Sequence, residues 1–187
     1  DKYDGSHRAR KSFHFFDNVI VCLGTDIENT DSKHNTETTV FQMAATDAKA
    51  QNYWKNYAVG NGKSWLDHAG TGYYTPQTVK FTGLVKQESR TQNTDKQTEG
   101  QWASLYFDHG KAPKNASYEY AVIPQTTREK IDAFAAAPTY KVLRADNEAH
   151  IVSSDATHTV SYVLFETPKD VLPGGPLLKA DTTCLAM

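Results

Sequence analysis

Four side chains that can carry positive charge crowd into five positions near the start of the sequence: His7, Arg8, Arg10 and Lys11. Guanidinium groups match the paired oxygens of carboxylates and sulfates, so this cluster is the strongest candidate for a binding function. Two hypotheses are open, and for an isolated run of charges the solvated segment is the more common outcome. The cluster is either a basic lip for a carboxylated or sulfated chain, or a run of charges that keeps an N-terminal segment in solvent.

Two histidines each follow an aspartate, at Asp67-His68 and Asp108-His109, and an adjacent carboxylate can orient an imidazole for acid–base chemistry. Neighbouring residues of a strand point to opposite faces, however, so these aspartates are poorly placed to touch the histidines that follow them. No serine or cysteine in a nucleophile context accompanies either pair. We therefore predict structural histidines in turns and assign no catalytic residue.

The polar stretch 25–37 is rich in oxygen ligands, and such loops can hold calcium. Its carboxylates are Asp26, Glu28, Asp31 and Glu37. Their spacing is not that of an EF-hand, and the glycine that the EF-hand turn requires is missing. A solvated polar loop is therefore favoured, and no metal ligand is assigned.

Aromatic residues gather between positions 53 and 74, where they could form a platform for sugar rings or fill a core. The core is favoured for Trp65 and Tyr73, and both alternatives stay open for Trp54. The two cysteines, Cys22 and Cys184, are predicted to be free buried thiols, although a single bridge between them is compatible with an oxidising compartment.

Short β-rich segments position these groups. Phe13–Phe16 and the apolar run Val19–Leu23 flank Asp17-Asn18, a pair that suits a two-residue hairpin turn. The apolar run predicts a strand buried on both faces. Further strands are expected at 38–42, 64–68, 79–85, 102–107, 118–123, 140–143, 150–153 and 159–165.

The connections carry their own signals. Asp108-His109-Gly110 is expected to turn the chain, and the polar stretch 87–101 to form a long exposed loop or an irregular hairpin. A capping box from Thr126 to Glu129 predicts one short helix, which Pro138 ends. Many short strands without a βαβ rhythm predict an all-β fold, a large antiparallel β-sandwich of the super-sandwich kind with one short helix.

The bulk composition is that of a globular domain. The chain has 187 residues, of which 22% are charged and 39% hydrophobic, with a net charge of −2. This charge does not indicate nucleic-acid binding, and no apolar run has the length of a membrane span. A polyanionic partner would need a local basic patch.

Several blocks, in order, resemble the central β-sandwich domain of polysaccharide lyase family 8, the chondroitin and hyaluronan lyases. The first block runs from Arg10-Lys11-Ser12 through the aromatic strand and Leu23-Gly24 to Glu37-Thr38-Thr39-Val40-Phe41-Gln42. The second is Trp65-Leu66-Asp67-His68 followed by Gly70-Thr71-Gly72-Tyr73-Tyr74. The third is Tyr106-Phe107-Asp108-His109-Gly110 followed by Pro113-Lys114-Asn115-Ala116-Ser117-Tyr118-Glu119-Tyr120.

The resemblance implies a parent enzyme that cleaves glycosaminoglycans (chondroitin or dermatan sulfate, or hyaluronan) by β-elimination at uronic acid. In that family the catalytic Asn, His, Tyr and Arg sit on an N-terminal helical toroid, and no stretch of this sequence matches their motifs. The resemblance thus implies a supporting β-sandwich that is inactive alone. Arg8, Arg10 and Lys11 would be its sugar-facing residues.

The resemblance also implies a secreted or periplasmic bacterial parent, with a toroid and a C-terminal β domain as partners in the same chain and with calcium open as a cofactor. No nucleic-acid or membrane partner is expected. We expect an N-terminal segment 1–11, the sandwich 12–167, a linker 168–176, and the start of a truncated C-terminal β unit at 177–187. The alternative function is a stand-alone carbohydrate-binding or scaffold module. A small enzyme that uses His68 or His109 fits poorly.

Overall fold

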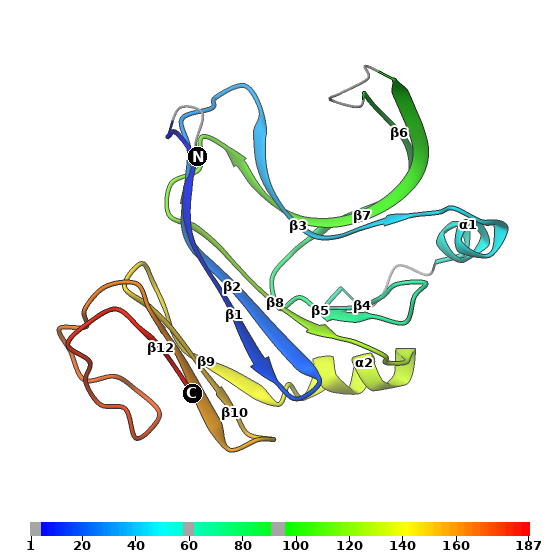
Figure 1. Ribbon diagram of the computed structural model, residues 1–187. Helices are drawn as coiled ribbons and strands as arrows, with labels where there is room; N and C mark the ends of the chain where they lie inside the picture. Colours follow the sequence, from blue (N-terminus) through cyan, green and yellow to red (C-terminus); the bar gives the residue numbers. More distant parts are fainter. Residues whose placement is uncertain (1–4, 58–61, 91–95) are drawn as a thin grey trace.

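Three antiparallel sheets and two helices make up the computed structural model, which describes residues 5–57, 62–90 and 96–187 (Figure 1). The central sheet has the order β1-β2-β8-β5-β4, with β1 Arg8–Phe16, β2 Val19–Glu28, β8 Ala116–Ile123, β5 Gly72–Tyr74 and β4 Ser64–Leu66. The curved sheet has the order β3-β7-β6, with β3 Asn35–Ala44, β7 Gln97–Lys111 and β6 Lys80–Arg90.

The C-terminal sheet has the order β12-β11-β10-β9, with β12 Leu185–Ala186, β11 Thr159–Leu164, β10 Ala149–Ser154 and β9 Tyr140–Ala145. The helices are α1 Ala48–Lys55 and α2 Arg128–Ala136. No helix in the described ranges is long and apolar enough to cross a membrane. The all-β prediction is therefore confirmed, with a second helix that it did not include.

The middle strands of the central sheet are buried on both faces, whereas Phe13 and Phe15 of the edge strand β1 are exposed. Val21 and Leu23 of β2 pack with Tyr140 and Val152 of the C-terminal sheet. Cys22, which points the opposite way along the strand, packs with Phe107 of the curved sheet. The same alternation divides β8 and β5 between the two sides, so the sandwich has three layers. The prediction that Val19–Leu23 is buried on both faces is thus confirmed for Val21, Cys22 and Leu23, whereas Val19 and Ile20 are half-buried.

Local sequence signals explain several boundaries. Phe16 pairs with Val19 across the predicted two-residue turn, and Asp17 takes a positive φ of 46° there. Helix α2 begins one residue later than expected, because Thr127 and not Thr126 accepts the capping hydrogen bond from the Lys130 amide. Residues 87–101 form the hairpin alternative, since β6 and β7 pair as far as Arg90 and Gln97.

Three predictions were wrong. The stretch 25–37 is not one polar loop, because β2 continues to Glu28 and β3 begins at Asn35. Helix α1 was missed, although the Asp47 side chain accepts a hydrogen bond from the Ala50 amide and caps it. The expected turn at residues 108–110 is instead part of β7, because β3 still offers Asn35 as a pairing partner for Lys111. Gly110 takes a positive φ of 76° inside this strand.

The chain's last residues cover the outer face of the C-terminal sheet. Leu172 is buried there, and Leu177 and Cys184 pack beside it. Strand β12 pairs with β11. Cys22 is free and buried, as predicted, whereas Cys184 is free but only half-buried. Whether residues 177–187 begin a separate β unit stays a prediction.

A buried chain of hydrogen bonds joins the central sheet to the C-terminal sheet. The Thr25 hydroxyl donates to the carbonyl of Asp146, over 3.0 Å, so its oxygen accepts the His150 Nε2 hydrogen, over 2.8 Å. His150 is therefore protonated on Nε2 alone. Its Nδ1 must accept from the Ser12 hydroxyl, 2.7 Å away.

The same logic fixes the next imidazole. Because the Ser12 hydrogen is already used, its oxygen accepts from His14 Nε2 at 2.9 Å, and His14 Nδ1 accepts from the Ser161 hydroxyl at 2.9 Å. Both rings are neutral and each has one donor and one acceptor. Burial lowers the pKa of each histidine to about 4, and for His14 the neighbouring His150 contributes.

This chain of hydrogen bonds predicts an acid-sensitive stability. The unfolded histidines titrate near pH 6.5 and the folded ones near 4, so the unfolded state binds more protons in between. Stability is complete above pH 6.5 and is lost as the pH falls towards 4, by roughly 3 kcal/mol for each histidine. Denaturant unfolding between pH 8 and 4 measures the free energy of unfolding. His150→Gln should halve the slope of this free energy against pH, because one of the two buried histidines is removed. Equal slopes for the two proteins would contradict the assignment.

Candidate functional site

The predicted basic lip lies on β1, at an edge of the central sheet. Arg8 is exposed, but its Nε lies 2.8 Å from Glu28 Oε1 and 3.8 Å from Asp26 Oδ2. Asp26 and Glu28, which were considered as calcium ligands, therefore neutralise the charge of Arg8. The side chain remains at the surface, where such pairs are weak and exchange with other anions.

Arg10 points towards the C-terminal sheet. Its Nη2 donates to Glu166 Oε1 at 2.9 Å, and its guanidinium lies 5.5 Å from the centre of the Phe165 ring. The Phe165 ring packs edge-on against the buried His150. Arg10 thus links β1 to the residues that follow β11. Its positive charge is already paired with Glu166, so it is less available to a ligand.

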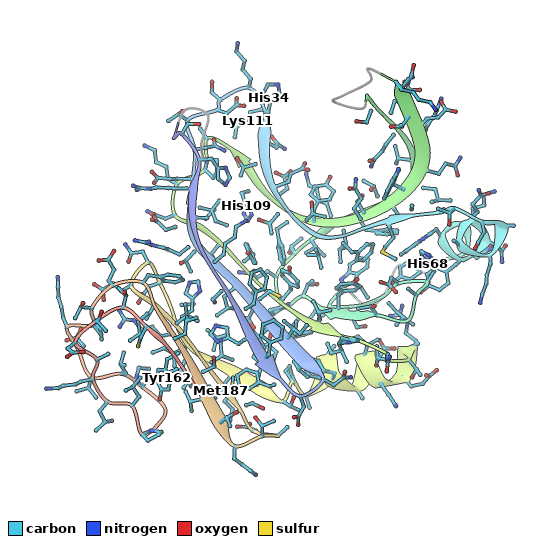
Figure 2. All side chains as sticks on the ribbon, viewed as in Figure 1. His34, His68, His109, Lys111, Tyr162 and Met187 are labelled. Carbon is cyan, nitrogen blue, oxygen red and sulfur yellow. The ribbon has the colours of Figure 1, made fainter. Side chains whose placement is uncertain are left out.

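Lys11 points to the opposite side of β1, towards the curved sheet. It is exposed and has no carboxylate partner within residues 5–57, 62–90 and 96–187. His109 of β7 lies on this side, in the region labelled in Figure 2. Burial lowers the pKa of His109, and the charges of Lys11 and His7 lower it further against the opposing effect of Asp108.

The structure therefore divides the predicted site. A register shift between Arg8 and Arg10 separates those two residues, and alternation along β1 puts Arg10 and Lys11 on different faces. The missed neighbour of Lys11 is His109. Only long-range pairing of the sheets brings them together, so no local signal could have shown it.

Asp67 and His68 have structural roles. Asp67 Oδ1 accepts from the Ala69 and Thr71 amides, each at 2.9 Å, and its Oδ2 accepts from the Tyr73 hydroxyl at 2.9 Å. These bonds fix the turn between β4 and β5. His68 Nδ1 accepts from the indole of Trp54 at 3.1 Å, as a neutral imidazole does.

The aromatic cluster is a core, not a platform. Trp54, Trp65 and Tyr73 are all buried beside Phe41 of the curved sheet. The core prediction is confirmed for Trp65 and Tyr73, and the open question over Trp54 is resolved in the same way. Tyr53 and Tyr57 line a surface hollow of about 320 Å³ together with Arg128.

The remaining predicted polar groups are also engaged locally. His109 Nε2 lies 2.9 Å from the Thr38 hydroxyl, and Asp108 accepts from the Lys80 ammonium at 2.6 Å. Asp31 accepts from the Lys33 and His34 amides and from His34 Nδ1, which lower the pKa of the Asp31 carboxyl to about 2. Among the described residues, no group of three His, Cys, Asp or Glu side chains could hold a metal ion.

Known proteins resemble this chain in sequence and in fold. The family description "polysaccharide lyase family 8, super-sandwich domain" matches residues 1–135. The chain belongs to polysaccharide lyase family 8. Its sequence is 58% identical, over all 187 residues, to a chondroitin sulfate ABC exolyase of Bacteroides thetaiotaomicron, and 34% identical over 192 residues to one of Proteus vulgaris.

These relatives are much longer than this chain. The match covers 18% of the Bacteroides enzyme and 19% of the Proteus enzyme. Among solved structures, a chondroitin AC lyase of Streptomyces coelicolor A3 in complex with chondroitin sulphate shares the fold, with a TM-score of 0.73. It is 24% identical, and the match covers 88% of this chain and 22% of that one.

Substitution of Asp67 tests whether its carboxylate fixes the turn between β4 and β5. Asp67→Ala removes three hydrogen bonds to a buried carboxylate, and we expect the free energy of unfolding to fall by about 2–4 kcal/mol. Asp155→Ala breaks only an exposed ion pair with Lys141 and should cost less than about 1 kcal/mol. Equal losses in denaturant unfolding would show that Asp67 does not fix the turn.

Proposed function

We propose that this chain is the supporting β-sandwich of a glycosaminoglycan lyase, which cleaves chondroitin or dermatan sulfate, or hyaluronan, by β-elimination at uronic acid. The observation that carries the proposal is the 58% identity along the whole chain to a chondroitin sulfate ABC exolyase. A stand-alone carbohydrate-binding module is the weaker alternative, because the matching relatives are longer enzymes.

The reaction has requirements that can be compared with the residues here. β-Elimination needs a base for the proton beside the carboxylate, an acid for the leaving oxygen, and a cation to neutralise the carboxylate. His14 and His150 are buried and fully hydrogen-bonded, and His68 accepts from Trp54. His14 and His150 do not face solvent. We propose that the catalytic groups belong to other parts of the parent chain.

The buried tyrosines fit a catalytic role no better. Burial raises the pKa of Tyr118 to about 12, and burial with neighbouring carboxylates raises the pKa of Tyr73 and Tyr140 further. A tyrosine that acts as a base needs a pKa shifted in the opposite direction. We propose that the chain holds one wall of the substrate cleft, beside a helical toroid and a C-terminal β domain.

Lys11 is the residue of the lip best placed to meet an anionic sugar. Its ammonium is exposed and unneutralised, whereas Arg8 and Arg10 already have carboxylate partners. We propose a secreted or periplasmic location as well, since the polymers are met outside the cytoplasm. Calcium in the parent stays open.

Binding to chondroitin sulfate tests the lip. We expect salt-sensitive binding that Arg8→Ala/Arg10→Ala/Lys11→Ala abolishes, with Lys11→Ala alone causing more than half of the loss in binding free energy. Lys130→Ala, on α2 away from the N-terminus (Figure 1), is the matched control and should bind normally. Titration at low and physiological salt measures this. Unchanged binding in the triple variant would exclude the lip.

The isolated chain should be catalytically inactive. When it is mixed with chondroitin sulfate or hyaluronan, no ultraviolet absorbance of an unsaturated uronate should develop, because the base and acid are supplied elsewhere. Circular dichroism on the same sample shows whether the chain is folded. An absorbance increase by the folded chain would contradict the assignment of a supporting role.

A further inference from the structure

The curved sheet has an outer face that nothing in the described chain covers. Its inner side chains, such as Phe41 and Leu105, pack against the central sheet. The alternate side chains point outward, and the arm formed by β6 and β7 bends over this side, so the face is concave (Figure 1). Strand register sets these outward residues in rows across the three strands.

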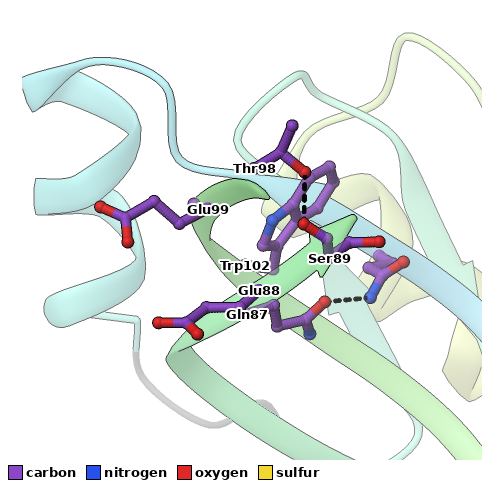
Figure 3. Close-up of a pocket in the computed structure, with 8 residues that line it drawn as sticks. Gln87, Glu88, Ser89, Thr98, Glu99 and Trp102 are labelled. Atoms are coloured by element: carbon purple, nitrogen blue, oxygen red, sulfur yellow. Dashed lines mark hydrogen bonds between the residues drawn. The ribbon is translucent and has the colours of Figure 1, made fainter. Parts of the chain in front are cut away.

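Three rows form the floor of the groove. Tyr106 pairs with Thr39, Ser104 pairs with Gln42 and Thr82, and Trp102 pairs with Val85. The residues around two adjoining hollows, of about 250 Å³ and 200 Å³, share Gln42 and Gln87. Gln42 Nε2 donates to Gln87 Oε1 at 2.8 Å between them (Figure 3).

The floor combines apolar rings with uncharged polar groups. Val85 is 47% exposed, although it is apolar, and it lies beside the half-buried Trp102. Tyr106 and Trp102 are four residues apart on one strand, which separates their Cα atoms by about 14 Å. Sugars present apolar ring faces and hydroxyl edges, and such a floor offers both kinds of contact.

One hydroxyl in the middle of the floor lacks a partner. The Ser104 Oγ atom is buried, and among the described residues no group forms a hydrogen bond with it. Buried polar atoms are nearly always satisfied, so an unpaired one indicates a missing ligand or water. It lies between the rows of Tyr106 and Trp102, where a ligand on the floor would reach it.

The charges around the groove argue against a polyanion. Lys80 at one end is held by Asp108 at 2.6 Å, with Glu37 beside them. The charged residues that line the two hollows are Glu37, Glu88 and Glu99, and no described lining residue is a cation, so a sulfated chain would be repelled.

We infer that the concave face of the curved sheet binds an uncharged oligosaccharide, at a site separate from the β1 lip. Tyr106 and Trp102 stack on sugar rings, and Gln42, Gln87 and Ser104 hydrogen-bond to hydroxyls. The inference does not depend on the proposed lyase function, because its ligand lacks the uronate that the lyase reaction requires.

Tryptophan fluorescence tests this on the 187-residue chain. Trp54 and Trp65 are 3% exposed, so Trp102 dominates quenching by a soluble quencher. The probes are cellotetraose, xylotetraose, mannotetraose and chitotetraose, with a chondroitin sulfate tetrasaccharide for comparison. We expect saturable protection of Trp102 by at least one uncharged probe, unchanged when salt is raised.

Variants separate the groove from other surfaces. Tyr106→Ala should weaken binding at least about tenfold, whereas Tyr106→Phe keeps the ring and should bind within a few-fold. Phe15→Ala is the matched control, because Phe15 is a 62% exposed aromatic on β1, and it should bind normally. Protection by none of the uncharged probes, protection only by the charged one, or equal binding by Tyr106→Ala would overturn the inference.

Discussion

The rest of the structure depends on a central sheet whose middle strands are covered on both faces. Strands β2 and β8 contribute apolar side chains to both neighbouring layers, so neither strand can present a polar face to water. Packing in such a sheet is demanding. Gly24 shows this, because a Cβ atom there would lie 2.1 Å from the Tyr118 ring. Most polar groups that enter these layers are hydrogen-bonded, such as Ser12, His14, Asp67 and His150, since an unpaired buried polar group costs free energy.

This constraint explains why most of the buried histidines and tyrosines make structural contacts and are not free to act as acids or bases. The His14–Ser12–His150 chain joins two layers, Asp67 fixes a turn, and the lip arginines hold carboxylates or a strand end. Each group serves packing or register. The two surfaces that we propose for ligands are an edge, around Lys11, and a face, on the curved sheet. They differ in charge, and we assign them to different ligands.

Local signals in the sequence were sufficient for most strands. The Asp17-Asn18 turn and the apolar run after it are defined by neighbouring residues, and both were predicted correctly. Helix α1 was missed because its only buried residues, Ala50 and Trp54, give a weak apolar stripe. The strand through Asp108 was cut short because its pairing partner is about seventy positions away.

The candidate site was predicted less well, for a related reason. Four clustered cations suggest one patch, but a bulge and strand alternation distribute them over two faces. The carboxylates that neutralise Arg8 and Arg10 come from β2 and from beyond β11. Such partners depend on strand register and on the packing of the layers. Neither can be predicted from the spacing of the cations in the sequence.

Amide hydrogen exchange on the isolated chain tests the layered account most directly. If the two outer sheets protect the central one, amides of β2 and β8 exchange only through global unfolding and are the slowest in the protein. The ends of β6 and β7 and the short β12 should exchange through local opening and be much faster. Rapid exchange throughout β2 and β8 in the otherwise folded chain would contradict the claim that these layers form a self-supporting sandwich.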